Sequence, residues 1–149
     1  MTTILVINGP NLNRLGRRDP GQYGTTTLAD IERALVERAS ELGVQVESFQ
    51  SNHEGAIVDF IQERGDAADG AIINAGALSQ VGYSILDALI DAQLPVVEVH
   101  LSNIHARERF RQRSVFARVA RGQIAGLGWR GYVYALDYLA ASIAEDGSG

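Results

Sequence analysis

The chain has 149 residues, 13 basic and 18 acidic side chains, a net charge of −5 and no cysteine, and all of its basic residues are arginine. Without cysteine there is no disulfide framework, thiol nucleophile or thiolate metal site, and without lysine there is neither a Schiff-base amine nor a Walker-type phosphate loop. The acidic total also argues against nucleic acid as a partner.

The first apolar run, Ile4–Ile7, indicates a strand. No basic stretch of the kind that opens a secretory signal precedes it, and it is far shorter than the roughly 20 residues of a membrane span. We therefore expect no membrane segment and, because no cysteine is used, a reducing cytoplasmic location. A chain of this length predicts one domain, covering residues 1–149.

Four further apolar runs alternate with helical patterns. The predicted strands are Val44–Phe49, Gly70–Asn74, Pro95–Leu101 and Gly122–Leu127. A first helix is expected between Thr27, which with Asp30 resembles a capping box, and Gly43, a C-terminal stop. Further helices are expected near Glu54–Arg64, Ser79–Ala92 and Gly131–Ala144, before a frayed tail at Glu145–Gly149. The third carries the apolar residues Ile85, Leu86, Leu89 and Ile90.

This alternation gives five strand–helix units and predicts an α/β protein. The simplest arrangement is a flavodoxin-like three-layer sandwich with a five-stranded parallel sheet of order 2-1-3-4-5 and right-handed crossovers. Ligands of such sheets bind beyond the carboxyl ends of the strands, at the switch point between strands 1 and 3. The segments expected there are Asn8–Gly24, Asn74–Val81, Glu98–Ser102 and the arginine-rich segment that follows.

The segment Asn8–Gly24 takes about twenty residues where a connection of two to six would suffice, which suggests a functional loop. It contains three arginines and Tyr23 beside the expected crevice, so a lid over an anion is plausible. A tyrosine in a loop more often only packs its ring. The phenol of Tyr23 could act as a base at neutral pH if a cation such as Arg18 stabilised the phenolate.

Glu98 and His100 lie two residues apart on the fourth strand, so both point to the same face. A carboxylate beside an imidazole fixes its tautomer and favours its protonated form, which makes a competent general acid. A purely structural histidine is the alternative. We predict no metal site, because His105 is expected to open the next helical turn and no third strong ligand has suitable spacing.

Positive charge is concentrated in two segments. Arg14, Arg17 and Arg18 lie in the first loop, and the segment Leu101–Arg121 carries six arginines against Glu108 alone. Charge runs of this kind are often only a solvated face. Beside the crevice, however, they favour a small anionic substrate.

Six segments of the chain resemble type II 3-dehydroquinate dehydratase, in the right order and over nearly the whole length. They are NGPNLNRLG (8–16), RRDPGQYG (17–24), QSNHEG (50–55), INAG (73–76), EVHLSNIHARERFRQRS (98–114) and IAGLGWRGYVYAL (124–136). The Asn-Gly-Pro-Asn-Leu and Glu-Val-His-x-Ser-Asn blocks are the specific ones.

The resemblance implies a hydro-lyase of the shikimate pathway, or of quinate degradation, that converts 3-dehydroquinate to 3-dehydroshikimate without a metal or organic cofactor. Tyr23 would abstract the C2 proton, with Arg18 stabilising its phenolate, and the resulting enolate would be stabilised through a water positioned by Asn11. His100, held by Glu98, would protonate the leaving hydroxyl. The substrate would be bound by Asn74, Leu101, Ser102 and Arg111.

The resemblance also implies roles away from the reacting atoms. Arg107 would support a closed lid, and Asp87 would reach the site of a neighbouring subunit. The family assembles as a homododecamer built from trimers. No nucleic acid and no membrane is expected as a partner.

One segment departs from the family pattern. After Asn-x-Gly the family usually has Thr-His-Thr-Ser, whereas this chain has Ser79, Gln80, Val81 and Gly82, so Gln80 replaces a substrate-contacting histidine. An amide can donate a hydrogen bond but cannot carry charge. A working enzyme with compensated binding, a paralogue with a shifted substrate and a weakly active relative all remain open. A flavodoxin-like binding or signalling module is the non-catalytic alternative, since the architecture permits it.

Overall fold

The computed structural model describes residues 1–17, 19, 21 and 24–148. Its centre is one five-stranded parallel sheet, formed by β1 (Thr3–Asn8), β2 (Gln45–Gln50), β3 (Gly70–Asn74), β4 (Val96–His100) and β5 (Gly122–Ala125). The strand order is β2-β1-β3-β4-β5, which confirms the predicted order. The order reverses between β1 and β3, so the crevice expected at that switch point exists in this topology.

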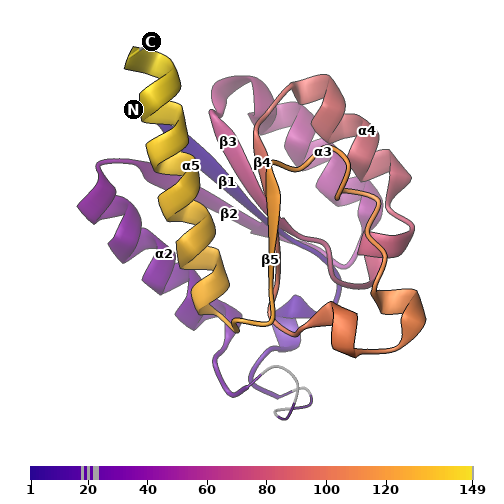
Figure 1. The fold of residues 1–149 in the computed structure, drawn as a ribbon. Coiled ribbons are helices and arrows are strands. Elements are labelled where there is room, and N and C mark those ends of the chain that lie inside the picture. The colour runs from indigo at the N-terminus through magenta and orange to yellow at the C-terminus, as the bar shows by residue number, and fades with distance from the viewer. Residues whose placement is uncertain (18, 20, 22–23, 149) are drawn as a thin grey trace.

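Helices cover both faces of the sheet (Figure 1). The helices α2 (Leu28–Leu42) and α5 (Arg130–Ser148) pack on one face, and α3 (Glu54–Arg64) and α4 (Tyr83–Ala92) on the other. Alternate residues of β1 serve the two layers, because successive side chains of a strand point to opposite faces. Ile4 and Val6 pack in the α2/α5 layer, whereas Leu5 and Ile7 pack in the α3/α4 layer.

Local signals in the sequence account for the ends of α2. Thr27 and Asp30 form a reciprocal capping box at its start, and Gly43 ends it with a φ of 71°. Both features were predicted, because each depends on residues within one helical turn.

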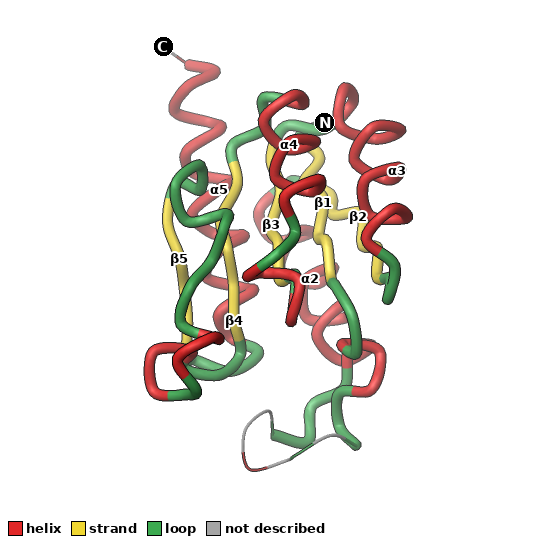
Figure 2. Tube along the Cα trace, turned by 90° about the vertical axis from the view of Figure 1, so that its right-hand side faces the viewer, coloured by secondary structure: helices red, strands yellow, loops and turns green. Residues whose placement is uncertain are grey.

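Short 3-10 helices carry the chain through the region beyond the carboxyl ends of the strands (Figure 2). They span Leu12–Arg14 after β1, Gly76–Gln80 after β3, and Ile104–Ala106 and Arg109–Arg111 after β4. The described connection from β4 to β5 contains 3-10 turns and no α-helix, so the fourth of the five strand–helix units expected from the sequence lacks its helix. The first 3-10 turn begins at Ile104, so His105, expected to open it, is its second residue.

Several predicted boundaries are wrong. The helix α4 begins at Tyr83 and not at Ser79, because Ser79 lies in a 3-10 turn and its carbonyl accepts the backbone N–H of Val115. The strand β5 ends at Ala125 and not at Leu127. The supposed tail continues α5 to Ser148, with Ile143 packed against the core.

The outer face of α4 carries an exposed apolar residue. Ile90, one of the apolar residues that indicated this helix, is 52% exposed. The buried side of the helix is formed by Ile85, Ala88 and Leu89, and Ile90 lies about 100° of helical rotation from Leu89. Among the described residues, no helix has the length and apolar character needed to cross a membrane.

Candidate active site

An open cavity lies beyond the carboxyl ends of β1, β3 and β4. The predicted site residues that line it come from all three strand ends and from the arginine-rich connection, and they are Asn11, Asn74, Gln80, His100, Leu101, Ser102, Arg107 and Arg111. Pro10, Leu12, Gly76, Ala77 and Ile104 complete the lining. The topology therefore brings these segments together where the sequence placed them.

The turn after β1 is tightly held. Asn11 has a left-handed conformation, with a φ of 70°, and its backbone N–H donates to Oδ1 of Asn52 at 2.9 Å. Gly9 lies against the segment after β3, where an added Cβ would lie 2.3 Å from the carbonyl oxygen of Ala75. Only glycine permits this approach, which sets the position of Asn11 relative to Asn74.

A buried polar cluster fixes the side chain of Asn74. The hydroxyl of Tyr132, on α5, accepts a hydrogen bond from Nδ2 of Asn74 at 2.9 Å and donates one to Oδ1 of Asn8 at 2.6 Å. The backbone N–H of Gly76 donates to Oδ1 of Asn74 at 3.3 Å. Burial raises the pKa of Tyr132, more than the hydrogen bond from Asn74 lowers it, so the phenol stays neutral and can donate.

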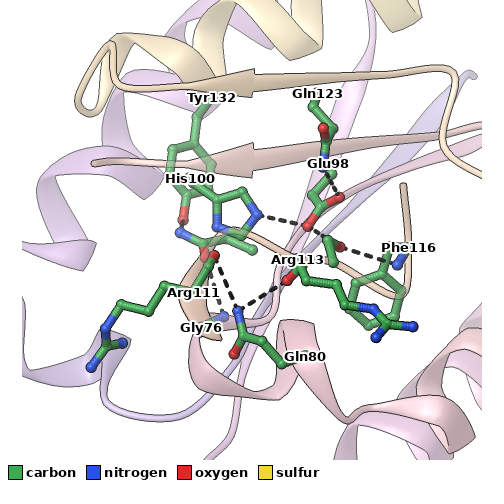
Figure 3. Close-up of polar contacts among 11 residues, drawn as sticks. Gly76, Gln80, Glu98, His100, Arg111, Arg113, Phe116, Gln123 and Tyr132 are labelled. Carbon is green, nitrogen blue, oxygen red and sulfur yellow. Dashed lines mark hydrogen bonds and ion pairs between the residues drawn. The ribbon is translucent and has the colours of Figure 1, made fainter. Parts of the chain in front are cut away.

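The carboxylate of Glu98 lies beside the imidazole of His100 (Figure 3). Glu98 is fully buried, His100 is 6% exposed, and Oε2 of Glu98 lies 2.6 Å from Nε2 of His100. Burial raises the pKa of Glu98, but the hydrogen bond and charge of His100, with further bonds from Ser114 and Gln123, outweigh it and leave that pKa lowered. An ionised Glu98 favours a proton on Nε2, so Nδ1 is the ring nitrogen that this pair leaves for proton transfer.

Asn74 and His100 reach the cavity from opposite faces of the sheet. His100 shares the face of Val96, which packs in the α3/α4 layer, whereas Asn74 meets Tyr132 of α5 on the other face. Their side chains meet a common space only because both lie at the last residue of a strand. This edge is where an α/β sheet presents both faces to one ligand.

Gln80 contacts the arginine-rich segment. Its Nε2 donates to the backbone carbonyls of Arg113 at 3.2 Å and Arg111 at 3.4 Å, as the dashed lines in Figure 3 show. The amide nitrogen is thus directed at the protein, and Oε1 is the end of the side chain left for another partner.

The cations of the cavity wall are held by neighbouring side chains. Nε of Arg111 donates to Glu108 at 3.1 Å, and this hydrogen bond is the main reason that the pKa of Glu108 is lowered. Arg107 donates from Nη1 to the hydroxyl of Ser102 at 3.4 Å. A guanidinium held at Nε can still offer its terminal nitrogens to a carboxylate, so this wall suits an anion.

Two predicted catalytic residues, Arg18 and Tyr23, lie outside the described residues. Within residues 1–17, 19, 21 and 24–148, no three or more His, Asp or Glu side chains are grouped so that they could hold a metal ion.

Comparisons with known proteins identify the family. The family model for class II dehydroquinases matches residues 2–140. The chain belongs to the class II dehydroquinase family. It is 57% identical to the 3-dehydroquinate dehydratase of Roseiflexus castenholzii, over 91% of this chain and 87% of the relative. It is 53% identical to that of Halothermothrix orenii, over 99% of both chains. The type II dehydroquinase structure from Butyrivibrio crossotus superimposes with a TM-score of 0.90 at 45% identity, over 93% of this chain and 97% of that one.

Two described residues of the predicted class II dehydroquinase site do not line this cavity. Glu98 lies behind His100, and Asp87, predicted to reach the site of a neighbouring subunit, is an exposed residue of α4. The side chains that sequence reasoning missed are the ones behind the wall, namely Tyr132, Ser114 and Gln123. The periodicity of a helix or strand can place a side chain on the inward face. It does not say which residue of another element that side chain will contact.

Proposed function

We propose that this chain eliminates water from 3-dehydroquinate to give 3-dehydroshikimate. Its membership of the class II dehydroquinase family supports this reaction, as do the names of its relatives. The observation that carries the proposal is the buried Glu98–His100 pair, which opens into an anion-binding cavity beside Asn74 and Arg111.

The reaction is proposed to proceed through an enolate. Tyr23, as a phenolate stabilised by Arg18, takes the C2 proton, and the electron pair moves onto the C3 carbonyl oxygen. These two roles rest on the motif resemblance. Asn11 helps to hold a water on the enolate oxygen, and the left-handed turn anchored by Asn52 supports that placement.

The enolate then collapses and expels the C1 hydroxyl. Nδ1 of His100, the ring nitrogen not paired with Glu98, gives the proton that turns this hydroxyl into water, while Glu98 stabilises the imidazolium from Nε2. The C1–O bond breaks, the conjugated enone forms, and the proton taken by Tyr23 must return to His100 before the next turnover.

The substrate carboxylate is proposed to pair with Arg111, with further contacts from Ser102, the backbone at Leu101 and the amide of Asn74. Arg107 would support this wall through its hydrogen bond to Ser102. A terminal guanidinium fork can bind a carboxylate in two places, which would fix the ring relative to His100.

The test is a direct assay. Purified protein is mixed with 3-dehydroquinate, and the ultraviolet absorbance of the conjugated enone is followed. We expect turnover that His100→Ala removes almost completely, while Tyr138→Phe, on the outer face of α5, leaves it unchanged. No absorbance change at high enzyme concentration would refute the proposal.

The assembly and location are further parts of the proposal. A homododecamer built from trimers would bring Asp87 to the site of a neighbouring subunit. The exposed position of Asp87 on α4 is compatible with such a contact. Gel filtration with light scattering tests the assembly, and a monomer that is fully active would contradict the role of Asp87. The absence of cysteine supports the reducing cytoplasm as the compartment.

Gln80 favours one second candidate, a related dehydration of a substrate with a different polar substituent. Its amide nitrogen is engaged by backbone carbonyls, so it offers an acceptor where the family usually has a histidine. Substrate analogues with altered hydroxyls, compared by kcat/KM, distinguish the two candidates. A preference for 3-dehydroquinate over every analogue would eliminate this second one.

A further inference from the structure

Glu98 accepts hydrogen bonds from three separate segments of the chain. Nε2 of His100 lies 2.6 Å from Oε2, the hydroxyl of Ser114 donates to the same oxygen at 2.6 Å, and Nε2 of Gln123 donates to Oε1 at 2.8 Å. Both oxygens of a fully buried carboxylate are therefore engaged. Burying a carboxylate is costly unless such partners are present.

The two neutral donors come from elements that the catalytic residues do not occupy. Gln123 is on the edge strand β5, directly opposite Glu98 in the register of the parallel pair, and Figure 3 shows its amide turned toward the carboxylate. Ser114 follows Arg111 by three residues in the connection from β4 to β5, and its oxygen also accepts the backbone N–H of Phe116. The carboxylate thus joins the acid, the edge strand and the anion-binding segment.

We propose that Ser114 and Gln123 are positioning residues for the general acid His100. They hold Glu98 in one orientation as an acceptor, which fixes the imidazole, and they stabilise the negative charge that remains when His100 has given its proton away. The proposal rests on the role of His100 in the proposed dehydration. The two side chains would act through Glu98 and would not touch the substrate.

The direction of their effect follows from charge. Before proton transfer the carboxylate faces an imidazolium, and afterwards it faces a neutral ring, so neutral donors stabilise the second state more. Without them the Glu98–His100 pair would keep its proton more tightly and His100 would be a weaker acid. Among the described residues, His100 is the charged group whose electrostatic interaction lowers the pKa of Glu98. The residue paired with Glu98 on β3 is the apolar Ile73.

Two independent variants test the proposal. Gln123→Leu and Ser114→Ala each remove one hydrogen-bond donor to Glu98. Ser114→Thr is the control that keeps the hydroxyl. Gln45→Leu is the control for the glutamine-to-leucine change, at an exposed position of the opposite edge strand β2. The pH titration of the Glu98–His100 pair is followed by the NMR signals of the His100 ring in the absence of substrate. Because the chain has only three histidines, loss of one signal in His100→Gln assigns it. The pH profile of kcat with 3-dehydroquinate is the second measurement.

We expect the NMR titration of the pair and the alkaline limb of the kcat profile, where His100 loses its proton, to move to higher pH in both donor variants, with kcat at pH 7 lowered about tenfold. Ser114→Thr and Gln45→Leu should match the unchanged protein. If the His100 titration in Gln123→Leu and Ser114→Ala coincided with that of the unchanged protein, the positioning role would be wrong. An unchanged protein without dehydratase activity would refute the proposed function, while the substrate-free titration would still report on Ser114 and Gln123.

Discussion

Tyr132→Phe removes one oxygen atom from the middle of a buried polar cluster. The hydroxyl is the donor to Asn8 at 2.6 Å and the acceptor from Asn74 at 2.9 Å, and all three side chains are at most 3% exposed. The variant therefore leaves a carbonyl oxygen and an amide nitrogen without these partners among buried side chains. Each unmet group costs about 1–3 kcal/mol, so we expect a loss of about 3 kcal/mol in the free energy of unfolding.

That loss corresponds to a measurable change in melting temperature. With about 2.1 cal/mol/K of unfolding entropy per residue, a chain of 149 residues has an unfolding entropy of about 0.3 kcal/mol/K. The expected fall in Tm is then about 10 °C. Because Asn74 also loses the bond that orients its amide toward the cavity, we expect KM for 3-dehydroquinate to rise about fivefold while kcat changes less.

The assays are thermal unfolding by circular dichroism and steady-state kinetics. Tyr138→Phe is the matched control, because it removes the same atom from the same helix at a position that is 46% exposed. It should leave Tm and KM unchanged. If Tyr132→Phe melted within about 2 °C of the unchanged protein, the buried cluster would not contribute as reasoned.

Three further predictions follow from other contacts. Gly9→Ala places a Cβ 2.3 Å from the carbonyl oxygen of Ala75, so the free energy of unfolding in urea should fall by more than about 2 kcal/mol; an unchanged urea midpoint would contradict it. Because the pKa of Glu98 is lowered from 4.5 in the folded chain, its contribution is present above pH 4.5 and is lost as pH falls through the lowered value. As pH is lowered through this range, the urea midpoint of Glu98→Gln should therefore fall less steeply than that of the unchanged protein. Equal slopes of the two proteins would refute this. Gln80→His should change KM more than kcat. If KM and kcat of the variant both equalled those of the unchanged protein, this position would not contact the substrate.

The sequence alone predicted the fold with most of its boundaries. Hydrophobic alternation and helical spacing depend on neighbours a few residues apart, so α3 was predicted at its observed bounds and the capping box of Thr27 was recognised. The errors fall where distant contacts decide. Ser79 was assigned to α4, but its carbonyl is taken by Val115, some 36 residues further along the chain, and the backbone there adopts a 3-10 turn.

The candidate site divides in the same way. The pairing of Glu98 with His100 was predictable because a spacing of two on a strand places both side chains on one face. The lining by Asn74, Gln80 and Arg111 followed from strand order and from the position of each residue after a strand. The local sequence contained this information because parallel strands present their carboxyl ends at one edge.

Only the tertiary structure decided which groups stand behind that lining. Tyr132 meets Asn74 across 58 residues of sequence, and Gln123 meets Glu98 across 25. It also decided that Asn74 and His100 reach the cavity from opposite faces of the sheet. A side chain's own periodicity gives its direction, but its partner depends on the register of neighbouring strands and the packing of a helix, which no short stretch of sequence contains.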